Sequence, residues 1–146
     1  MFHRLVFLYT KFQCLSNLFR GTILAYMAKK ILLVEDEKAL ATVLNLKLKG
    51  AGYETAVVYN GDDALEALKP GGYDLMIIDI MMPKRDGFSV LDEMKKLNNN
   101  TPVFAMSNLG QDEDIARIKK MGVKDYIVKA DASPADILAR IKTFLG

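Results

Sequence analysis

Four short apolar runs in this sequence are each followed by side chains that suit phosphoryl chemistry. In chain order these side chains are Glu35 with Asp36, Asp79, Ser107 and Lys129. Carboxylates that are packed together repel each other unless a cation joins them. Mg²⁺ typically takes one or two carboxylates together with waters and phosphate oxygens. The acid pair could therefore hold Mg²⁺ beside a residue that accepts a phosphoryl group.

Asp79 is the candidate nucleophile of this set. One of its oxygens could bind the metal while the other attacks a phosphoryl group. Lys129 would neutralise the added negative charge, and the Ser107 hydroxyl would hydrogen-bond to a phosphoryl oxygen. Because phosphoryl transfer depends mainly on positioning and charge neutralisation, these groups are sufficient for it. Glu37 has a simpler expected role, which is to cap the helix that follows it.

Each of these residues also has an ordinary explanation when it is taken alone. Asp79 could be a loop aspartate, Ser107 a turn residue and Lys129 an exposed lysine. Taken together, these explanations do not account for the pattern, because all the positions fall at the carboxyl ends of separate predicted strands. Open α/β sheets bind their ligands at that edge, where the strand order reverses.

The scaffold that must position these residues is predicted by alternating apolar runs and helical patterns. The predicted strands cover residues 31–34, 55–59, 75–78, 102–106 and 125–128, and the predicted helices cover residues 38–49, 62–69, 88–97, 112–121 and 134–145. Asn60 predicts a helix cap, and Ser133-Pro134 with Asp136 predicts a strong helix start. This alternation indicates an α/β fold, in which right-handed crossovers place helices on both faces of a parallel sheet.

The composition fits one domain in a reducing compartment. The chain has 146 residues, of which 51% are apolar, and its 20 basic and 18 acidic residues leave no excess for binding nucleic acid. The single cysteine, Cys14, cannot form a disulfide within the chain. No segment approaches the roughly 20 apolar residues of a membrane span. We therefore expect a soluble, cytoplasmic protein that does not bind DNA directly.

Residues 1–26 differ from the rest of the chain. They carry Arg4, Lys11 and Arg20 and no acid, whereas the remainder has 17 basic and 18 acidic side chains. We expect a domain over residues 27–146, preceded by an N-terminal extension. The extension is either non-native sequence upstream of a true start at Met27, a helix that binds a membrane surface or a partner, or an added packing element.

The sequence resembles the receiver domain of bacterial two-component response regulators, in its stand-alone, chemotaxis-regulator-like form. The matching stretches are Ile31 to Glu37, Tyr73 to Pro83, Asp86-Gly87 and Asp125 to Lys129. The resemblance covers about residues 29–146 and implies a flavodoxin-like, doubly wound sheet with strand order 2-1-3-4-5 and five helices. It also implies a phosphorylation-dependent switch of a phosphorelay, which accepts a phosphoryl group from a histidine kinase or phosphotransfer protein and is not a conventional turnover enzyme.

The resemblance assigns the metal site and the acceptor residue by residue. Glu35 and Asp36 would be the acid pair for Mg²⁺. Asp79 would be the phosphoacceptor and a metal ligand, and the backbone carbonyl of Met81 would be a further ligand. Lys129 would bind the phosphoryl group.

The resemblance also assigns switch residues and a loop. Ser107 would be the hydroxyl that reorients on phosphorylation, and Tyr126 the aromatic whose inward or outward rotamer reports the state. Without the family, Tyr126 would read as an ordinary half-buried strand aromatic. Pro83 and Gly87 would shape the loop after the acceptor, Pro83 by fixing its own φ and Gly87 by permitting φ > 0.

Three positions depart from the family pattern. Ala130 stands where the family usually has a cis proline, and since a non-proline cis bond costs about 2.5–4 kcal/mol, we expect a trans bond there. Asn108 replaces a small residue and is expected to narrow access to the phosphoryl group. Leu109 cannot orient an attacking water, so we expect slow self-hydrolysis of the phosphorylated form.

The sequence ends at Gly146, directly after the last predicted helix, which leads us to expect a stand-alone receiver. The output partner would bind the face formed by residues 112–121, 125–128 and 134–145. Three other functions have different residue requirements. A haloacid-dehalogenase-type phosphohydrolase would need an aspartate at Met81, and a flavin-binding module would need a Gly- and hydroxyl-rich loop where Glu35 to Glu37 stand. A degenerate receiver would bind partners without phosphorylation.

Overall fold

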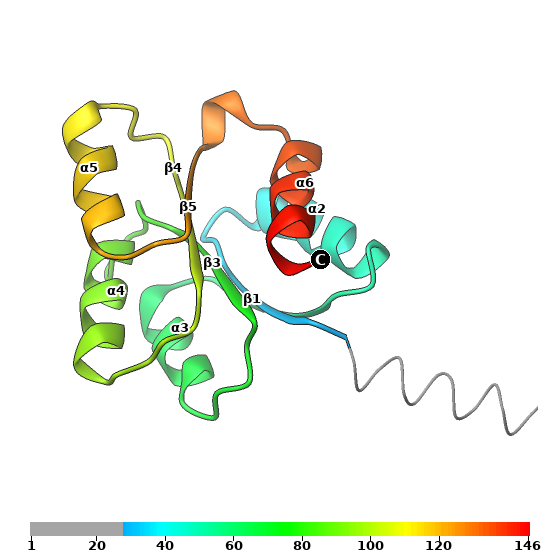
Figure 1. The fold of residues 1–146 in the computed structure, drawn as a ribbon, viewed down its shortest axis with the longest axis horizontal. Coiled ribbons are helices and arrows are strands. Elements are labelled where there is room, and N and C mark those ends of the chain that lie inside the picture. The colour runs from blue at the N-terminus through cyan, green and yellow to red at the C-terminus, as the bar shows by residue number, and fades with distance from the viewer. Residues whose placement is uncertain (1–27) are drawn as a thin grey trace, which may run out of the picture.

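The computed structural model describes residues 28–146, in which parallel strands alternate with helices (Figure 1). The strands are β1 (Lys30–Val34), β2 (Glu54–Val58), β3 (Leu75–Asp79), β4 (Val103–Ser107) and β5 (Asp125–Val128). The helices are α2 (Lys38–Gly50), α3 (Gly61–Leu68), α4 (Gly87–Lys96), α5 (Asp112–Lys120) and α6 (Pro134–Leu145), and a 3₁₀ turn, η1 (Lys129–Asp131), follows β5. The extension expected over residues 1–26 lies outside the described residues.

The sheet has the strand order β2-β1-β3-β4-β5, and all its neighbouring strands are parallel. The expected doubly wound α/β fold is therefore confirmed. Asp79 of β3 pairs with Met106 of β4, and Ser107 of β4 pairs with Val128 of β5. This register brings the carboxyl ends of the central strands to one edge of the sheet.

Helices cover both faces of the sheet, as Figure 1 shows: α2 and α6 lie on one face, and α3, α4 and α5 on the other. Successive residues of a strand point to opposite faces. Ile31 and Leu33 accordingly join the core beneath α2 and α6, whereas Leu32 and Val34 join the opposite core. Burial on both faces explains why the central strands read as continuous apolar runs.

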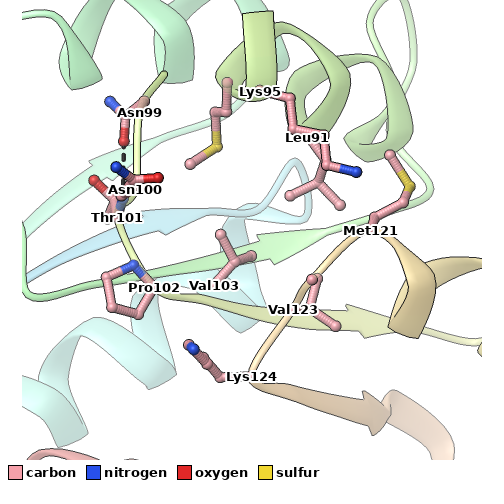
Figure 2. A pocket seen from close by; sticks show the side chains of 12 residues that line it. Leu91, Lys95, Asn99, Asn100, Thr101, Pro102, Val103, Met121, Val123 and Lys124 are labelled. Carbon is pink, nitrogen blue, oxygen red and sulfur yellow. Dashed lines mark hydrogen bonds between the residues drawn. The ribbon is translucent and has the colours of Figure 1, made fainter. Parts of the chain in front are cut away.

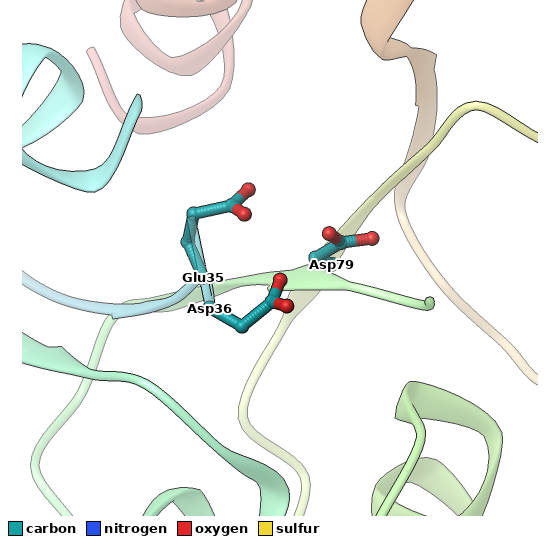
Figure 3. A group of neighbouring side chains, drawn as sticks. All are labelled: Glu35, Asp36 and Asp79. Carbon is teal, nitrogen blue, oxygen red and sulfur yellow. The ribbon is translucent and has the colours of Figure 1, made fainter. Parts of the chain in front are cut away.

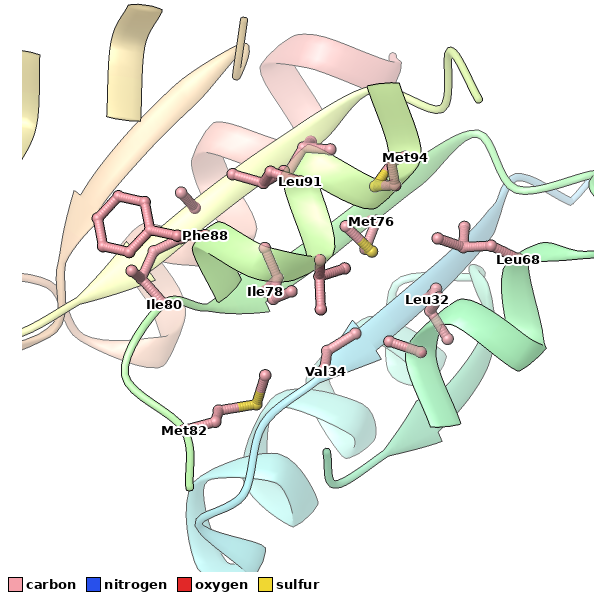
Figure 4. Packing of buried hydrophobic residues seen from close by; sticks show 14 of the residues in the cluster. Leu32, Val34, Leu68, Met76, Ile78, Ile80, Met82, Phe88, Leu91 and Met94 are labelled. Atoms are coloured by element: carbon pink, nitrogen blue, oxygen red, sulfur yellow. The ribbon is translucent and has the colours of Figure 1, made fainter. Parts of the chain in front are cut away.

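The core beneath α3, α4 and α5 reaches the loop that follows β3 (Figure 4). Met76 and Ile78 of β3 contribute to it from the sheet, and Phe88 and Leu91 contribute from α4. Ile80, the first residue of the loop, is fully buried in the same cluster. The loop after Asp79 is thus fixed by apolar packing at its start.

β1 and β3 are each one residue longer than expected, and two other strands are shifted by one residue. β4 covers 103–107 rather than 102–106, because Pro102 has no N–H to donate to a ladder, although its carbonyl accepts from the Met76 N–H. The shift places Ser107 inside the strand. β2 covers 54–58 rather than 55–59, since Glu54 pairs with Lys30 at the start of β1.

The helix starts confirm two caps and correct a third. The Asn60 side chain accepts a hydrogen bond from the backbone N–H of Asp63, and Ser133 forms a capping box with Asp136. Glu37 occupies the cap position of α2, but its side chain makes no capping hydrogen bond, so its expected role is wrong. Caps favour shorter side chains such as Asp, Asn and Ser.

Among residues 28–146, no helix combines the length and the apolar character that crossing a bilayer requires.

Candidate functional site

The polar side chains that the fold buries lie at one edge of the sheet. Within residues 28–146, the buried polar or charged residues are Glu35, Asp79 and Ser107. Glu35 directly follows β1, Asp79 ends β3 and Ser107 ends β4. Burying polar groups is costly unless they are paired. Their presence at the carboxyl edge, where the strand order reverses between β1 and β3, marks this edge as the candidate site.

Asp79 is held at both of its carboxylate oxygens. Its Oδ1 accepts a hydrogen bond of 2.9 Å from the backbone N–H of Met81, and its Oδ2 accepts one of 2.8 Å from the Lys129 ammonium. Lys129 follows β5 directly and lies in the turn η1. The acceptor and the cation expected beside it are therefore brought into contact.

Lys129 also contacts Glu35, so one ammonium joins two buried carboxylates. Its Nζ lies 3.2 Å from Glu35 Oε1 and 3.0 Å from Oε2. Burial disfavours the charged ammonium, but the hydrogen bonds to Asp79 and Glu35 outweigh it, and the pKa of Lys129 is raised. Lys129 is therefore a fixed positive charge in this site at neutral pH.

The Glu35 carboxyl is more easily protonated than an ordinary glutamate. Burial raises its pKa, and the hydrogen bond from Lys129 only partly offsets this effect. Its Oε2 is buried and has no hydrogen-bond partner, because the geometry of a hydrogen bond to Lys129 is met only at Oε1. The ion pair with Lys129 at 3.0 Å therefore leaves this buried oxygen only partly satisfied.

Three carboxylates could supply a metal ion here. One oxygen from each of Glu35, Asp36 and Asp79 lies within 4.8 Å of the others, and the three side chains group at the ends of β1 and β3 (Figure 3). Asp36 is partly exposed, which leaves an open side for water or substrate oxygens. A hard divalent cation would bind Glu35 Oε2, which makes no hydrogen bond, so the residues present fit Mg²⁺. The assignment of the Met81 carbonyl as a further ligand stays a prediction.

Ser107 and Tyr126 meet at the backbone of Leu109. The Ser107 Oγ accepts a hydrogen bond of 3.1 Å from the Leu109 N–H, and the Tyr126 hydroxyl donates to the Leu109 carbonyl. Burial raises the pKa of Tyr126, and hydrogen bonding with Ser107 opposes the rise. The two residues expected to act as a switch are thus joined, although their switching roles stay predictions.

The loop between β3 and α4 uses its glycine for a reason other than the expected one. Gly87 does not have a positive φ; Lys84 does, at 68°. A Cβ at Gly87 would lie 2.7 Å from the Cα of Ile80 and 3.0 Å from the carbonyl oxygen of Asp79. Gly87 is therefore needed because α4 starts against the backbone of Asp79 and Ile80, and the expectation that it serves positive φ is wrong.

The three departures from the family pattern lie around this edge. Asn108 is exposed, and Leu109 packs, half-buried, against the apolar cluster beneath α4 and α5. Residues 28–146 contain no cis peptide bond, which confirms the expected trans bond between Lys129 and Ala130. Lys129 reaches Asp79 without a cis bond. How these positions affect the phosphoryl group stays a prediction.

A hollow of about 320 Å³ lies at the opposite edge of the sheet (Figure 2). Val103 at the start of β4 and Lys124 just before β5 line it, together with Leu91 and Lys95 of α4. It contains none of the predicted site residues. Its size is that of a small-molecule pocket, but the convergent titratable groups are at the carboxyl edge, which is where we place the function.

Comparisons with known proteins agree with this geometry. Residues 31–142 match the family model of the response regulator receiver domain. The chain is 37% identical over 113 residues to the transcriptional regulatory protein DltR of Streptococcus agalactiae, an alignment that covers 77% of this chain and 50% of DltR. It is 36% identical over 115 residues to the uncharacterized transcriptional regulatory protein YkoG of Bacillus subtilis, covering 79% and 50%. The chain thus spans about half the length of these relatives.

Solved structures give the same fold. The receiver domain of the Francisella response regulator 1452 has a TM-score of 0.74 and 34% identity to this chain, and the match covers 79% of this chain and 94% of that one. The BeF3-activated receiver domain of DrrB has a TM-score of 0.72 and 27% identity, with coverage of 82% and 98%.

Proposed function

The chain belongs to the family of response regulator receiver domains, and from this premise we propose that it is a phosphorylation-dependent switch whose acceptor is Asp79. The observation that carries the proposal is the contact between the Lys129 ammonium and Asp79 Oδ2, at 2.8 Å, beside two further carboxylates. A structural aspartate at a strand end needs neither a buried lysine nor an acid cluster. An aspartate that gains a phosphoryl group needs both, because the product carries added negative charge.

The proposed donor is a phosphorylated histidine of a kinase or phosphotransfer protein. A carboxylate oxygen of Asp79 forms a bond to phosphorus while the phosphorus–nitrogen bond of the donor breaks, and the electron pair of that bond stays on the imidazole. Lys129 balances the charge that arrives, and Ser107 donates a hydrogen bond to a phosphoryl oxygen. The domain would catalyse this transfer onto itself rather than turn over a free substrate.

Glu35, Asp36 and Asp79 would hold Mg²⁺, with the Met81 carbonyl as a further ligand. The bound ion would neutralise charge on the transferred phosphoryl oxygens. The open side of Asp36 leaves room for them. Among residues 28–146, Lys129 pairs with Glu35 and Asp79 but not with Asp36, so one carboxylate of the cluster has no cation beside it and we expect phosphorylation to require the metal.

The proposed output is a change in the face formed by α5, β5 and α6. Tyr126 lies in β5, at the edge of the sheet, and its hydroxyl is tied to the loop that leads into α5. A phosphoryl group that engages Ser107 would disturb this loop and shift the population of the face's conformations. The partner that binds the face is an output protein.

The test is incubation with acetyl phosphate and Mg²⁺, followed by intact mass measurement. We expect an adduct of about 80 Da, one phosphoryl group, which is lost in Asp79→Ala and on chelation of the metal. Asp92→Ala, which removes an exposed carboxylate from α4, is the matched control and should keep the adduct. If neither acetyl phosphate nor a phosphorylated histidine donor gives an adduct, the chain is instead a receiver that binds partners without phosphorylation.

A further inference from the structure

One contact joins α4 to α5 across the surface, between Phe88 and Arg117. The guanidinium carbon of Arg117 lies 3.9 Å from the centre of the Phe88 ring, which is the geometry of a cation–π interaction. Phe88 is buried, and Arg117 is exposed and makes no ion pair among the described residues. α5 buries only one of its own residues, Ile118. The stacking on Phe88 therefore adds to the packing of Ile118 in fixing α5 in place.

Phe88 is itself fixed relative to the acceptor. It follows Gly87, whose N–H donates a 2.9 Å hydrogen bond to the carbonyl of Ile80. A Cβ at Gly87 would meet backbone atoms of Ile80 and Asp79 at 3.0 Å or less. The start of α4 cannot move independently of the acceptor's backbone, so Phe88 is a rigid platform.

The N-terminal end of α5 is joined to β4 by residues 108–111, which we call the Ser107 loop. Only residues 108–111 separate Ser107 from the start of the helix at Asp112. Within this loop, the Leu109 N–H donates to Ser107 Oγ and the Leu109 carbonyl accepts from Tyr126. A movement of Ser107 toward a phosphoryl oxygen must therefore either break these bonds or carry the start of α5 with it.

We infer that Arg117 is a positioning residue that holds α5 and the Ser107 loop in the conformation described here, by stacking on Phe88. The inference rests on the proposed function, because it concerns the conformation that receives the phosphoryl group. Helix shifts in switching proteins are about 1–2 Å, and at 3.9 Å a shift of that size forfeits much of the stacking. Arg117 thus opposes the phosphoryl-bound conformation.

The expected effect of removing the guanidinium follows from the strength of the contact. An exposed cation–π interaction contributes about 0.5–1 kcal/mol, which converts to roughly a two- to five-fold change in the equilibrium between the conformations. A ligand that binds only one conformation gains affinity in proportion to that population. Arg117→Gln should therefore bind a phosphoryl analogue about two- to five-fold more tightly. Loss of a positive charge alone would weaken the binding of an anion. The direction of the change in affinity therefore distinguishes a positioning role from a general charge effect.

The experiment is a titration of the full chain with beryllium fluoride in Mg²⁺, followed by the amide resonances of residues 107–111. Lys119→Gln is the matched control, because it removes one positive charge from the exposed surface of the same helix without a described aromatic or ion-pair contact. Phe88→Leu keeps an apolar side chain and removes the ring, and should act like Arg117→Gln. The double variant should bind no more tightly than either single one, since both remove the same contact.

The outcomes separate this inference from the function on which it rests. Suppose that the wild-type chain binds the analogue. The positioning role is overturned if the affinity of Arg117→Gln for the analogue equals that of Lys119→Gln or is lower than that of the wild type. It is also overturned if the effects of Arg117→Gln and Phe88→Leu on this affinity add in full in the double variant. A wild-type chain that shows no response to the analogue overturns the proposed function, and the role of Arg117 with it. A loss of thermal stability without any change in analogue affinity would assign Arg117 a purely structural role and would also overturn the inference.

Discussion

Gly87→Ala is the substitution for which the structure gives the sharpest expectation. The added Cβ would lie 2.7 Å from the Ile80 Cα, 2.9 Å from the Ile80 Cδ1 and 3.0 Å from the Asp79 carbonyl oxygen. Two of these three atoms belong to the backbone and cannot turn away as a side chain can. Overpacking costs typically 1–3 kcal/mol, and we expect the upper half of that range, about 2–3 kcal/mol.

Gly50→Ala is the matched control. Gly50 ends α2, does not have a positive φ, and has no atom within 4 Å of the position of an added Cβ. Alanine at such a site stabilises a protein by about 0.4–1 kcal/mol, because it restricts the unfolded chain. The two alanine variants should therefore differ by about 3 kcal/mol. In a domain of this size the difference corresponds to roughly 10 °C in Tm.

The assay is urea unfolding of the wild type and both variants, with the slopes checked for equality, together with the rate of phosphorylation by acetyl phosphate at 25 °C. Gly87→Ala should also slow phosphorylation while it remains folded, since relief of the clash must displace the backbone of Asp79. The reasoning is refuted if Gly87→Ala and Gly50→Ala unfold within 0.5 kcal/mol of each other, because α4 would then not start against the acceptor.

Three further predictions follow from named contacts. Ser133→Ala should destabilise the protein at pH 7, because it removes the hydroxyl that donates to the Asp136 carboxylate and accepts from the Asp136 N–H. Hydrogen bonds from Ser133 hold the pKa of Asp136 below its usual value, so the carboxylate's part of this stability is present above the unfolded pKa and is lost as the pH falls through the lower folded pKa. In urea unfolding of both proteins the difference should therefore shrink as the pH is lowered, while the part from the cap hydrogen bond to Ser133 Oγ remains. Lys129→Gln should cost about 3–5 kcal/mol without metal, because it leaves the buried carboxylates of Glu35 and Asp79 without their cation. Mg²⁺ should restore part of the loss in the same unfolding assay. Leu109→Gln should shorten the lifetime of the phosphorylated form several-fold by orienting a water, measured as phosphate release; an unchanged lifetime would refute the expected slow self-hydrolysis of the wild type.

The scaffold was predictable because its signals are local. A strand buried on both faces reads as an unbroken apolar run, and the 3.6-residue period marks the helices between such runs. The convergence of Glu35, Asp79, Ser107 and Lys129 followed from one further fact, which is that parallel strands place their carboxyl ends at one edge. Side-chain type and position at a strand end together sufficed to predict which residues meet.

The remaining features depend on contacts that no local pattern encodes. Gly87 is required by the backbone of Ile80, seven residues earlier, and only the path of the loop reveals it. The positive φ in this loop falls on Lys84, a residue type that gives no such signal. The hydrogen bonds of Leu109 use its N–H and carbonyl, which every residue except proline carries, so the side chain predicts nothing about them.

Those backbone bonds of Leu109 have a physical consequence for the proposed switch. Ser107 and Tyr126 bind the N–H and the carbonyl of the same residue, so neither can change partner without affecting the other. If Ser107 turned to a phosphoryl oxygen and the loop moved with it, the Tyr126 hydroxyl would lose its acceptor. Tyr126 is half-buried, so a hydroxyl that loses this acceptor can turn toward water, which favours a new orientation of Tyr126. Because the link runs through the backbone, it persists whichever side chain occupies position 109, and that side chain remains free to set the lifetime of the phosphoryl group.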